Sequence, residues 1–178
     1  MKLQRRASIL LVLVLVSLAA GAAPVAAASP TASSVLTSVS THVLADGTRV
    51  VLSKVTVDTA NGDMYPQSAG QWSAGCNMTG YSAYGRIWTY TVTQEFWSNG
   101  SYITYFPPPA KSGTGWLGWV LTSSPEPTHW WISYPYTAAA RGSYTFTWFD
   151  ISGHSLGSTT GWVEVDVNFA GTWSCQGA

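Results

Sequence analysis

GRIWTYTVTQEFWSNGSYITYF, residues 85–106, alternates large side chains with threonines over its first half. A period of two places successive side chains on opposite faces of an extended chain, so this pattern predicts a β-strand with one buried face. The face predicted to be buried carries Trp88, Tyr90, Val92, Gln94 and Phe96. The opposite face carries the threonines together with Glu95 and Trp97.

Asn99-Gly100 predicts a two-residue hairpin turn after this strand, because these residue types adopt the positive φ angles of a type I′ turn. Residues that lie opposite each other across a hairpin share a face of the sheet. The register set by this turn places Ile103 and Tyr105 on the core face. It brings Trp97 and Tyr102 together on the polar face.

The rest of the sequence repeats these signals. Asp46-Gly47 predicts another type I′ hairpin turn, while residues 143–148 and 162–169 alternate as strands and place Tyr144 and Trp148 in the core. No long segment after the N-terminal region shows the 3.6-residue apolar spacing of a helix. We therefore predict an all-β fold, an antiparallel β-sandwich that is immunoglobulin-like or jelly-roll-like.

Other segments carry weaker signals. Residues 67–85 are rich in glycine and serine and are predicted to be irregular, and residues 59–63 to form a turn. Residues 110–127 are predicted to be a loop with one short strand at 119–122. Proline cannot donate to a strand ladder, so the three prolines after Phe106 end a strand and Pro135 indicates an edge strand.

Residues 142–169 resemble the last two strands of bacterial immunoglobulin-like domains. Those strands commonly run from glycine and a small residue through tyrosine and an alternating strand to Asp, a Ser-Gly turn and a valine-rich closing strand. The resemblance covers under a fifth of the chain. It implies a sandwich architecture and no particular function.

Residues 1–28 have the features of a secretory signal peptide: three basic residues, an uncharged apolar run over 9–18, and a small-residue tract. Ala26 and Ala28 fit the positions that a signal peptidase reads, which predicts a mature chain starting at Ser29. The alanine-rich signal is typical of bacteria.

The predicted mature chain divides into a flexible segment, 29–40, and a single sandwich domain, 41–178. Five basic and eight acidic residues remain after the signal, a net charge of −3. Nucleic-acid binding requires a basic surface, so we expect no nucleic-acid partner. We also expect no membrane contact after signal cleavage, and secretion to the extracellular space or the cell surface.

Cys76 and Cys175 are the only cysteines. An even pair in an exported chain predicts a disulfide bond. We expect this bond to fix the C-terminal tail and a glycine- and serine-rich loop around Cys76, with Trp72 and Trp173 packed beside it.

The sequence is rich in aromatic residues and poor in charged ones, with ten tryptophans, nine tyrosines and only 9% charged residues. Those without a clear place in the predicted core are candidates for ligand binding, because an exposed ring can stack on the C–H face of a sugar. Within residues 129–136, a strand candidate, the adjacent Trp130 and Trp131 must point to opposite faces. The candidate residues are Trp97, Tyr102, Trp116, Trp119, Trp130, Trp131 and Tyr134.

Acidic and histidine residues give little sign of catalysis or metal binding. Glu164 and Asp166 lie on one face of a predicted strand, about 7 Å apart, a spacing that glycosidase carboxylate pairs also show. Alternating acids on an outer strand face ordinarily serve solvation. Asp150 and His154 could hold a metal across a turn, but Asp150 is expected to cap that turn. We predict no cofactor and no metal.

Three hypotheses follow for the function. The first is a secreted, non-catalytic protein that binds extracellular or cell-wall carbohydrate through exposed aromatic residues. The second is a secreted protein-interaction module, similar to an adhesin, a toxin or an inhibitor. The third is a small glycoside hydrolase that uses Glu164 and Asp166.

Overall fold

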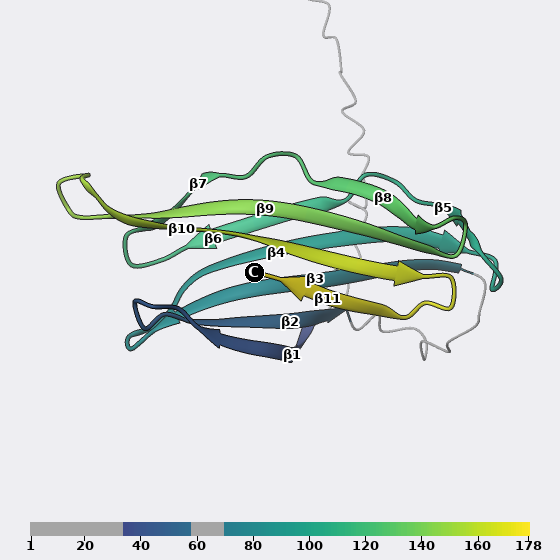
Figure 1. The fold of residues 1–178 in the computed structure, drawn as a ribbon, viewed down its shortest axis with the longest axis horizontal. Coiled ribbons are helices and arrows are strands. Elements are labelled where there is room, and N and C mark those ends of the chain that lie inside the picture. The colour runs from purple at the N-terminus through teal and green to yellow at the C-terminus, as the bar shows by residue number, and fades with distance from the viewer. Residues whose placement is uncertain (1–33, 58–69) are drawn as a thin grey trace, which may run out of the picture. The chain divides into compact units, whose positions relative to one another are not determined.

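The computed structural model describes residues 34–57 and 70–178. These residues form strands and turns without a helix, and the strands make two antiparallel sheets that face each other (Figure 1). The all-β fold and the sandwich-like arrangement predicted from the sequence are thus confirmed. In the described ranges there is no helix with the length and apolar character needed to cross a membrane.

The first sheet has six strands. They run in the order β1-β2-β3-β4, and both β5 and β6 pair with the far edge of β4. The six strands are β1 (Ser34–Val43), β2 (Arg49–Val57), β3 (Gly70–Ser82), β4 (Gly85–Ser98), β5 (Ile103–Tyr105) and β6 (Ala110–Gly115).

The second sheet has five strands in the order β11-β10-β9, and both β7 and β8 pair with the far edge of β9. The five strands are β7 (Trp119–Ser123), β8 (Thr128–Ser133), β9 (Thr137–Phe149), β10 (Ser155–Asn168) and β11 (Trp173–Gly177). Strand order follows chain order in both sheets, so each is a meander and the chain passes between them from β6 to β7. Immunoglobulin-like and jelly-roll sandwiches reach a similar two-layer arrangement through Greek-key connections.

The core lies between the sheets, where the inward-facing side chains of the strands meet. The face of β4 predicted to be buried is buried, and the Trp88 ring stacks on Phe146 of β9 with centroids 5.3 Å apart. The valines of β10 fill the facing layer, as the alternation predicted. The fully buried large side chains are Trp88, Tyr90, Phe96, Phe146, Met78, Gln94, Val92, Val163, Val165 and Val167.

The prediction of an irregular segment at 67–85 was wrong, because residues 70–82 form the central strand β3 between β2 and β4. Its glycines reflect close packing rather than turns. A Cβ atom on Gly80 would lie 2.3 Å from Cε2 of Trp88, and one on Gly75 would lie 2.9 Å from Cβ of Val55. Small residues are required where large neighbours occupy the volume.

The loop predicted at 110–127 contains β6 as well as β7, which matches the short strand predicted at 119–122. A Cβ atom on Gly113 would lie 2.9 Å from Leu121 and 3.1 Å from Tyr90. The glycine-rich composition that indicated a loop thus serves close packing here too. The prolines at 107–109 separate β5 from β6, as predicted. The turn predicted at 59–63 lies outside the described residues.

The turn after β4 is longer than predicted. Ser98 pairs with Ile103 and Trp97 with Tyr105, and the Asn99 side chain accepts the N–H groups of residues 101 and 102. The prediction that Tyr105 is core was wrong, because the shifted register leaves its side chain 58% exposed. Trp97 lies against Tyr105, with ring centroids 5.1 Å apart, and not against Tyr102 as predicted.

The hairpin predicted at Asp46-Gly47 forms, with Val43 opposite Arg49. Only Gly47 in this turn has a positive φ, 83°, so the turn is not type I′. The bonds from Gly47 N to Leu44 O and from Leu44 N to Thr48 O describe a three-residue loop closed by glycine. Strand β1 begins at Ser34, within the segment that the sequence predicted to be flexible.

The disulfide bond between Cys76 and Cys175 is present and joins β3 of the first sheet to β11 of the second. Cys76 lies in a central strand and not in the loop that the sequence predicted. The Trp72 ring lies against Gly171, and the Trp173 ring lies beside the ammonium group of Lys54, the residue opposite Cys76. The bridge thus links the short strand β11 to β3, a strand of the opposite sheet that is paired on both sides.

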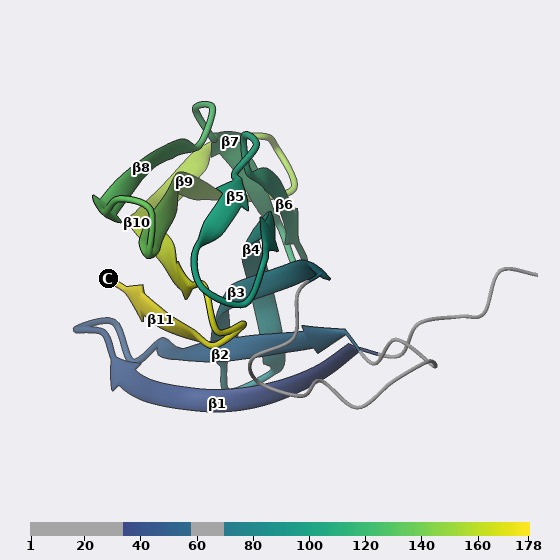
Figure 2. The same cartoon turned by 90° about the vertical axis from the view of Figure 1, so that its right-hand side faces the viewer.

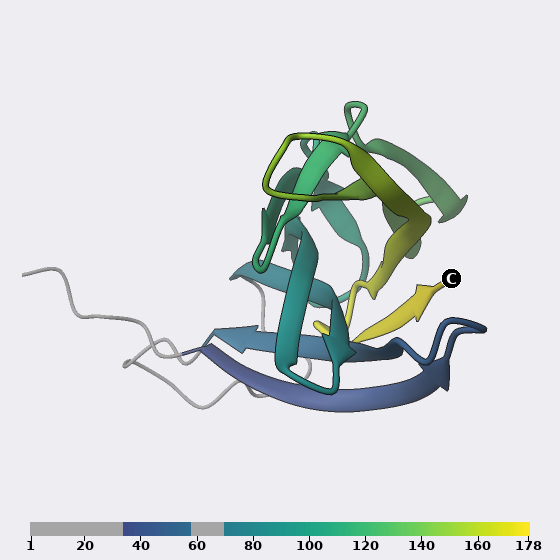
Figure 3. The ribbon, with the colours of Figure 1, turned by 90° about the vertical axis from the view of Figure 1, so that its left-hand side faces the viewer.

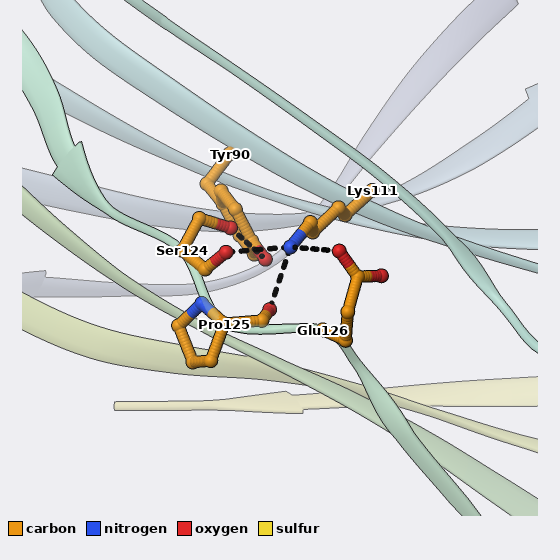
Figure 4. A network of polar contacts seen from close by, with 5 residues as sticks. All are labelled: Tyr90, Lys111, Ser124, Pro125 and Glu126. Carbon is orange, nitrogen blue, oxygen red and sulfur yellow. Dashed lines mark hydrogen bonds and ion pairs between the residues drawn. The ribbon is translucent and has the colours of Figure 1, made fainter.

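Lys111 holds the connection between β7 and β8 (Figure 4). Its ammonium group donates to the carbonyl oxygens of Ser124, at 2.5 Å, and Pro125, at 2.7 Å, and it lies 3.2 Å from the Glu126 carboxylate. The Tyr90 hydroxyl lies 3.1 Å from the Ser124 hydroxyl on the inner side of the same segment. One cation on β6 thus anchors a segment that connects two strands of the other sheet.

We expect Lys111→Met to lower the free energy of unfolding by about 1–3 kcal/mol, because two carbonyl oxygens lose a charged donor. Glu126→Gln is the matched control. The Glu126 side chain is 92% exposed, so its ion pair contributes no more than about 1 kcal/mol. Urea unfolding of both variants measures the difference, and equal losses would contradict the role assigned to the carbonyl contacts.

Candidate ligand-binding site

Few tryptophans are well exposed. Trp72 and Trp88 are buried, and only Trp130, at 38%, and Trp148, at 43%, expose more than a third of their surface. Trp148 was predicted to be core, and that prediction was wrong. The half-buried tryptophans are Trp97, Trp116, Trp119, Trp131, Trp162 and Trp173.

Several predicted site residues lie apart from one another. Trp116 lies beneath the guanidinium group of Arg86, 4.3 Å from its ring centroid. Trp119 packs against the core and stacks on Trp148, with centroids 6.4 Å apart and ring planes at 12°. Trp116 and Trp119 lie close to each other, and the Trp119 N–H donates to the Trp116 carbonyl oxygen at 3.0 Å. Both lie far from the candidates Tyr102 and Tyr134, because β6 and β7 turn at the opposite end of the sandwich from β5 and β8 (Figure 1).

Tyr102, Trp131 and Tyr134 are brought together, at the end of the sandwich that Figure 2 faces. The N–H of Ile103 donates to the carbonyl oxygen of Pro135 at 2.8 Å, and this bond joins the β4–β5 loop to the β8–β9 turn. A shallow hollow of about 550 Å³ lies at this junction. We call it the tyrosine hollow, and its lining is Tyr102, Ile103, Thr104, Tyr134 and Pro135.

The rings behind the tyrosine hollow form a chain that leads to the core. Tyr134 meets Trp131 edge-on, with centroids 5.0 Å apart, and Trp131 lies 5.5 Å from Phe106. Phe106 and Trp131 pack against the buried cluster, so this chain supports the exposed Tyr134 ring from below. Trp131 therefore supports the hollow and does not line it.

The local sequence explains why these tyrosines stay at the surface. The prolines at 107–109 end β5 after three residues, so Tyr102 and Tyr105 lie on a short edge segment. The N–H of Tyr136 donates to Ser133 O at 2.7 Å and closes the β8–β9 turn beyond Tyr134. Strand β8 pairs only with β9 among the described strands, which confirms the edge strand that Pro135 indicated.

Four exposed tyrosines gather at this end. The main exposed rings here are thus tyrosines and not the tryptophans that the sequence indicated. Their exposed fractions are 44% for Tyr102, 58% for Tyr105, 74% for Tyr134 and 50% for Tyr136. Sequence reasoning missed Tyr105 and Tyr136. The position of Tyr136 directly after Pro135 in a turn could have indicated its exposure. Tyr105 was assigned to the core face because the turn after β4 was predicted to be shorter than it is.

The outer face of the second sheet holds Trp130, the remaining candidate. The Arg141 guanidinium lies 5.6 Å from the Trp130 ring centroid and 4.2 Å from that of Trp162. Arg141 also binds the Glu164 carboxylate, with Nε donating at 2.6 Å. Arg141 therefore has a structural role, because its charge is paired with Glu164 and its guanidinium lies against the rings of Trp130 and Trp162.

Glu164 and Asp166 do not have the arrangement that a glycosidase needs. Glu164 is 5% exposed, and its carboxylate is paired with the Arg141 guanidinium. A catalytic carboxylate has to reach the sugar or a water molecule, and this one is covered. Neither the tyrosine hollow nor the cavity described below is lined by these residues. The geometry therefore does not favour the hydrolase hypothesis.

Burial raises the pKa of Glu164 above its ordinary value, although Arg141 lowers it in part. The folded state thus keeps a proton that the unfolded state loses, so stability falls as pH rises from the ordinary glutamate pKa through the raised one. We expect Glu164→Gln to remove this fall, whereas the exposed Glu95→Gln keeps it. Urea unfolding from pH 4 to 8 measures both, and an unchanged profile in Glu164→Gln would contradict the assignment.

The Asp150–His154 turn is capped as predicted. The Asp150 carboxylate accepts the N–H groups of Ser152 and His154, both at 2.8 Å, and these bonds lower its pKa. Within the two described ranges, no group of three or more His, Cys, Asp or Glu residues is placed to hold a metal ion.

These features define an all-β, disulfide-linked sandwich with a tyrosine-lined hollow at one end. Comparison of the chain with protein-family models, with curated proteins and with solved structures finds no match.

Proposed function

We propose that the protein is a secreted, non-catalytic binding protein, and that it recognises extracellular or cell-wall carbohydrate at the tyrosine hollow. The observation that carries the proposal is the convergence of two exposed tyrosines, Tyr102 and Tyr134, around one hollow. Among the described residues, no charged side chain lines the hollow. Ring faces with neutral hydroxyl groups suit a neutral sugar.

The chemistry of a pyranose supports this assignment. Its C–H groups carry a weak positive charge and stack on the electron-rich face of an aromatic ring, while its hydroxyls need hydrogen-bond partners. Tyrosine offers both a ring and a hydroxyl. The ring chain beneath Tyr134 holds that residue in place, which lowers the entropy cost of binding.

Export is part of the same proposal. The features of residues 1–28 and the disulfide bond between Cys76 and Cys175 both support it, since disulfides persist in oxidising compartments. N-terminal sequencing of the protein from the culture medium of an expressing bacterium should give Ser29 as the first residue. Retention of the protein in the cytoplasm with residues 1–28 uncleaved would contradict it.

The binding test is co-sedimentation with a panel of insoluble polysaccharides, such as cellulose, chitin and peptidoglycan. We expect Tyr102→Ala and Tyr134→Ala each to weaken binding about tenfold, the size of effect that a central aromatic contact gives. Tyr84→Ala is the matched control, because Tyr84 is 92% exposed and lies away from the hollow in the β3–β4 turn. Absence of binding to every polysaccharide, or equal binding by all three variants, would contradict the proposal.

A protein-interaction module is the second candidate, and one observation favours it. Strand β1 pairs only with β2 in the described sheet, and its side chains Leu36, Val39 and Val43 are 54%, 47% and 69% exposed. Edge strands with exposed apolar residues can pair with a strand of another protein. A Val39→Lys variant that loses a protein partner while keeping polysaccharide binding would favour this function for β1.

A further inference from the structure

A second hollow lies between the two sheets, at the end of the sandwich opposite the tyrosine hollow. Figure 3 faces this end of the sandwich. Its volume is about 270 Å³. Strands of both sheets contribute to its wall, and the exposed residues His42 and Leu44 lie at its rim. We call it the inter-sheet cavity, and its lining is His42, Leu44, Val50, Met78, Trp88, Tyr144, Thr159, Thr160, Gly177 and Ala178.

The wall of the inter-sheet cavity is mainly apolar. Val50, Met78, Trp88 and Tyr144 are all buried core residues, with exposed fractions of 7% or less. Burial raises the pKa of Tyr144, which shows how poorly this environment supports charge. No Lys, Arg, Asp or Glu side chain lines the cavity, so an ionised ligand would lack a charged side chain to pair with.

From this geometry we propose that the inter-sheet cavity binds a small, neutral, mainly aliphatic molecule. The size of the ligand follows from the volume. A cavity of about 150 Å³ binds benzene, so a cavity of 270 Å³ accommodates a molecule of about eleven non-hydrogen atoms. A medium-chain alcohol has this size and chemistry. The proposal is independent of carbohydrate binding at the tyrosine hollow.

The first experiment uses the unaltered protein and 1-decanol as the probe. Of the three methionines, Met78 is the one that lines the cavity, so methionine methyl NMR reports on it directly. We expect saturable movement of the Met78 methyl signal as 1-decanol fills the cavity. An unchanged Met78 signal up to the solubility limit of 1-decanol would overturn the proposal.

The charge and the place of the ligand are tested next. Decanoate and decyltrimethylammonium should bind at least tenfold more weakly than 1-decanol, and equal binding of either would overturn the neutral class. Leu44→Trp, at the rim, should weaken 1-decanol binding at least tenfold. Leu36→Trp is the matched control, because Leu36 is exposed on β1 and does not line the cavity.

Two outcomes of the variant test overturn the assigned site. One is equal binding of 1-decanol to Leu44→Trp and Leu36→Trp, and the other is shifts confined to tyrosines of the tyrosine hollow. Both variants change exposed residues, so the fold should persist, and circular dichroism checks it. Loss of polysaccharide binding in Tyr134→Ala with 1-decanol binding retained would show that the two sites are separate.

Discussion

Replacing Cys76 and Cys175 together by alanine is expected to lower the free energy of unfolding by about 4–5 kcal/mol. The bond closes a loop over a sequence separation of 99 residues, and a cross-link of that span removes much of the entropy of the unfolded chain. Thermal or urea unfolding of the double variant measures the loss. A loss below about 1 kcal/mol would show that the bond contributes little to the fold.

The same variant should lose order unevenly. Strand β11 pairs only with β10 over five residues, and Cys175 provides its covalent link to the first sheet. Strand β3 is held by β2 on one side and β4 on the other. Hydrogen exchange should therefore show a strong loss of protection in β11 and a smaller, uniform loss elsewhere. Equal loss in β3 and β11 would contradict this description.

Gly80→Ala is the other change with a large expected effect, a loss of about 3 kcal/mol in the free energy of unfolding. The new Cβ atom would lie 2.3 Å from the ring of Trp88, which is fully buried and cannot move aside without displacing Phe146 and Tyr144. Gly70→Ala on the same strand is the matched control, because no atom of the described residues beyond its chain neighbours lies within 4 Å of its Cβ position. It should change stability by no more than about 1 kcal/mol.

A double-mutant cycle tests whether the loss of stability in Gly80→Ala comes from a clash with the Trp88 ring. Trp88→Phe removes the part of the indole that the new Cβ atom would meet. Combined with Gly80→Ala, it should cost less than the sum of the two single changes, by an interaction energy of about 0.5–3 kcal/mol. Strict additivity would show that the loss in Gly80→Ala has another origin.

The strands with clear alternation were predictable from the sequence, and those built from small residues were not. The faces of β4 and β10 follow directly from a period of two in large apolar residues. The two strands β3 and β6 were hidden because Gly75, Gly80 and Gly113 suggested loops. The side chains of Val55, Trp88 and Leu121 fill the space beside those glycines, and a single sequence does not show that packing.

The candidate site was predictable in part. The sequence selected Tyr102, Trp131 and Tyr134 as candidates, and these residues do gather at one end. It also selected Trp116 and Trp119, which lie elsewhere. The length of the turn after Ser98 decided which tyrosines reach the surface, since a register shift moves a side chain to the other face. That length depends on the Asn99 side chain as a cap, which the Asn-Gly pair alone did not reveal.

The measurement that tests the central claim most directly is NMR mapping of a sugar complex. The isotope-labelled protein is titrated with soluble oligosaccharides cut from the polysaccharides that co-sediment with it. Binding at the tyrosine hollow predicts backbone and side-chain shifts at residues 102–105 and 134–136, with none around Trp130 on the outer sheet face or in the inter-sheet cavity. Saturable shifts centred on Trp130 and Trp162, with residues 102–105 and 134–136 unchanged, would contradict the account.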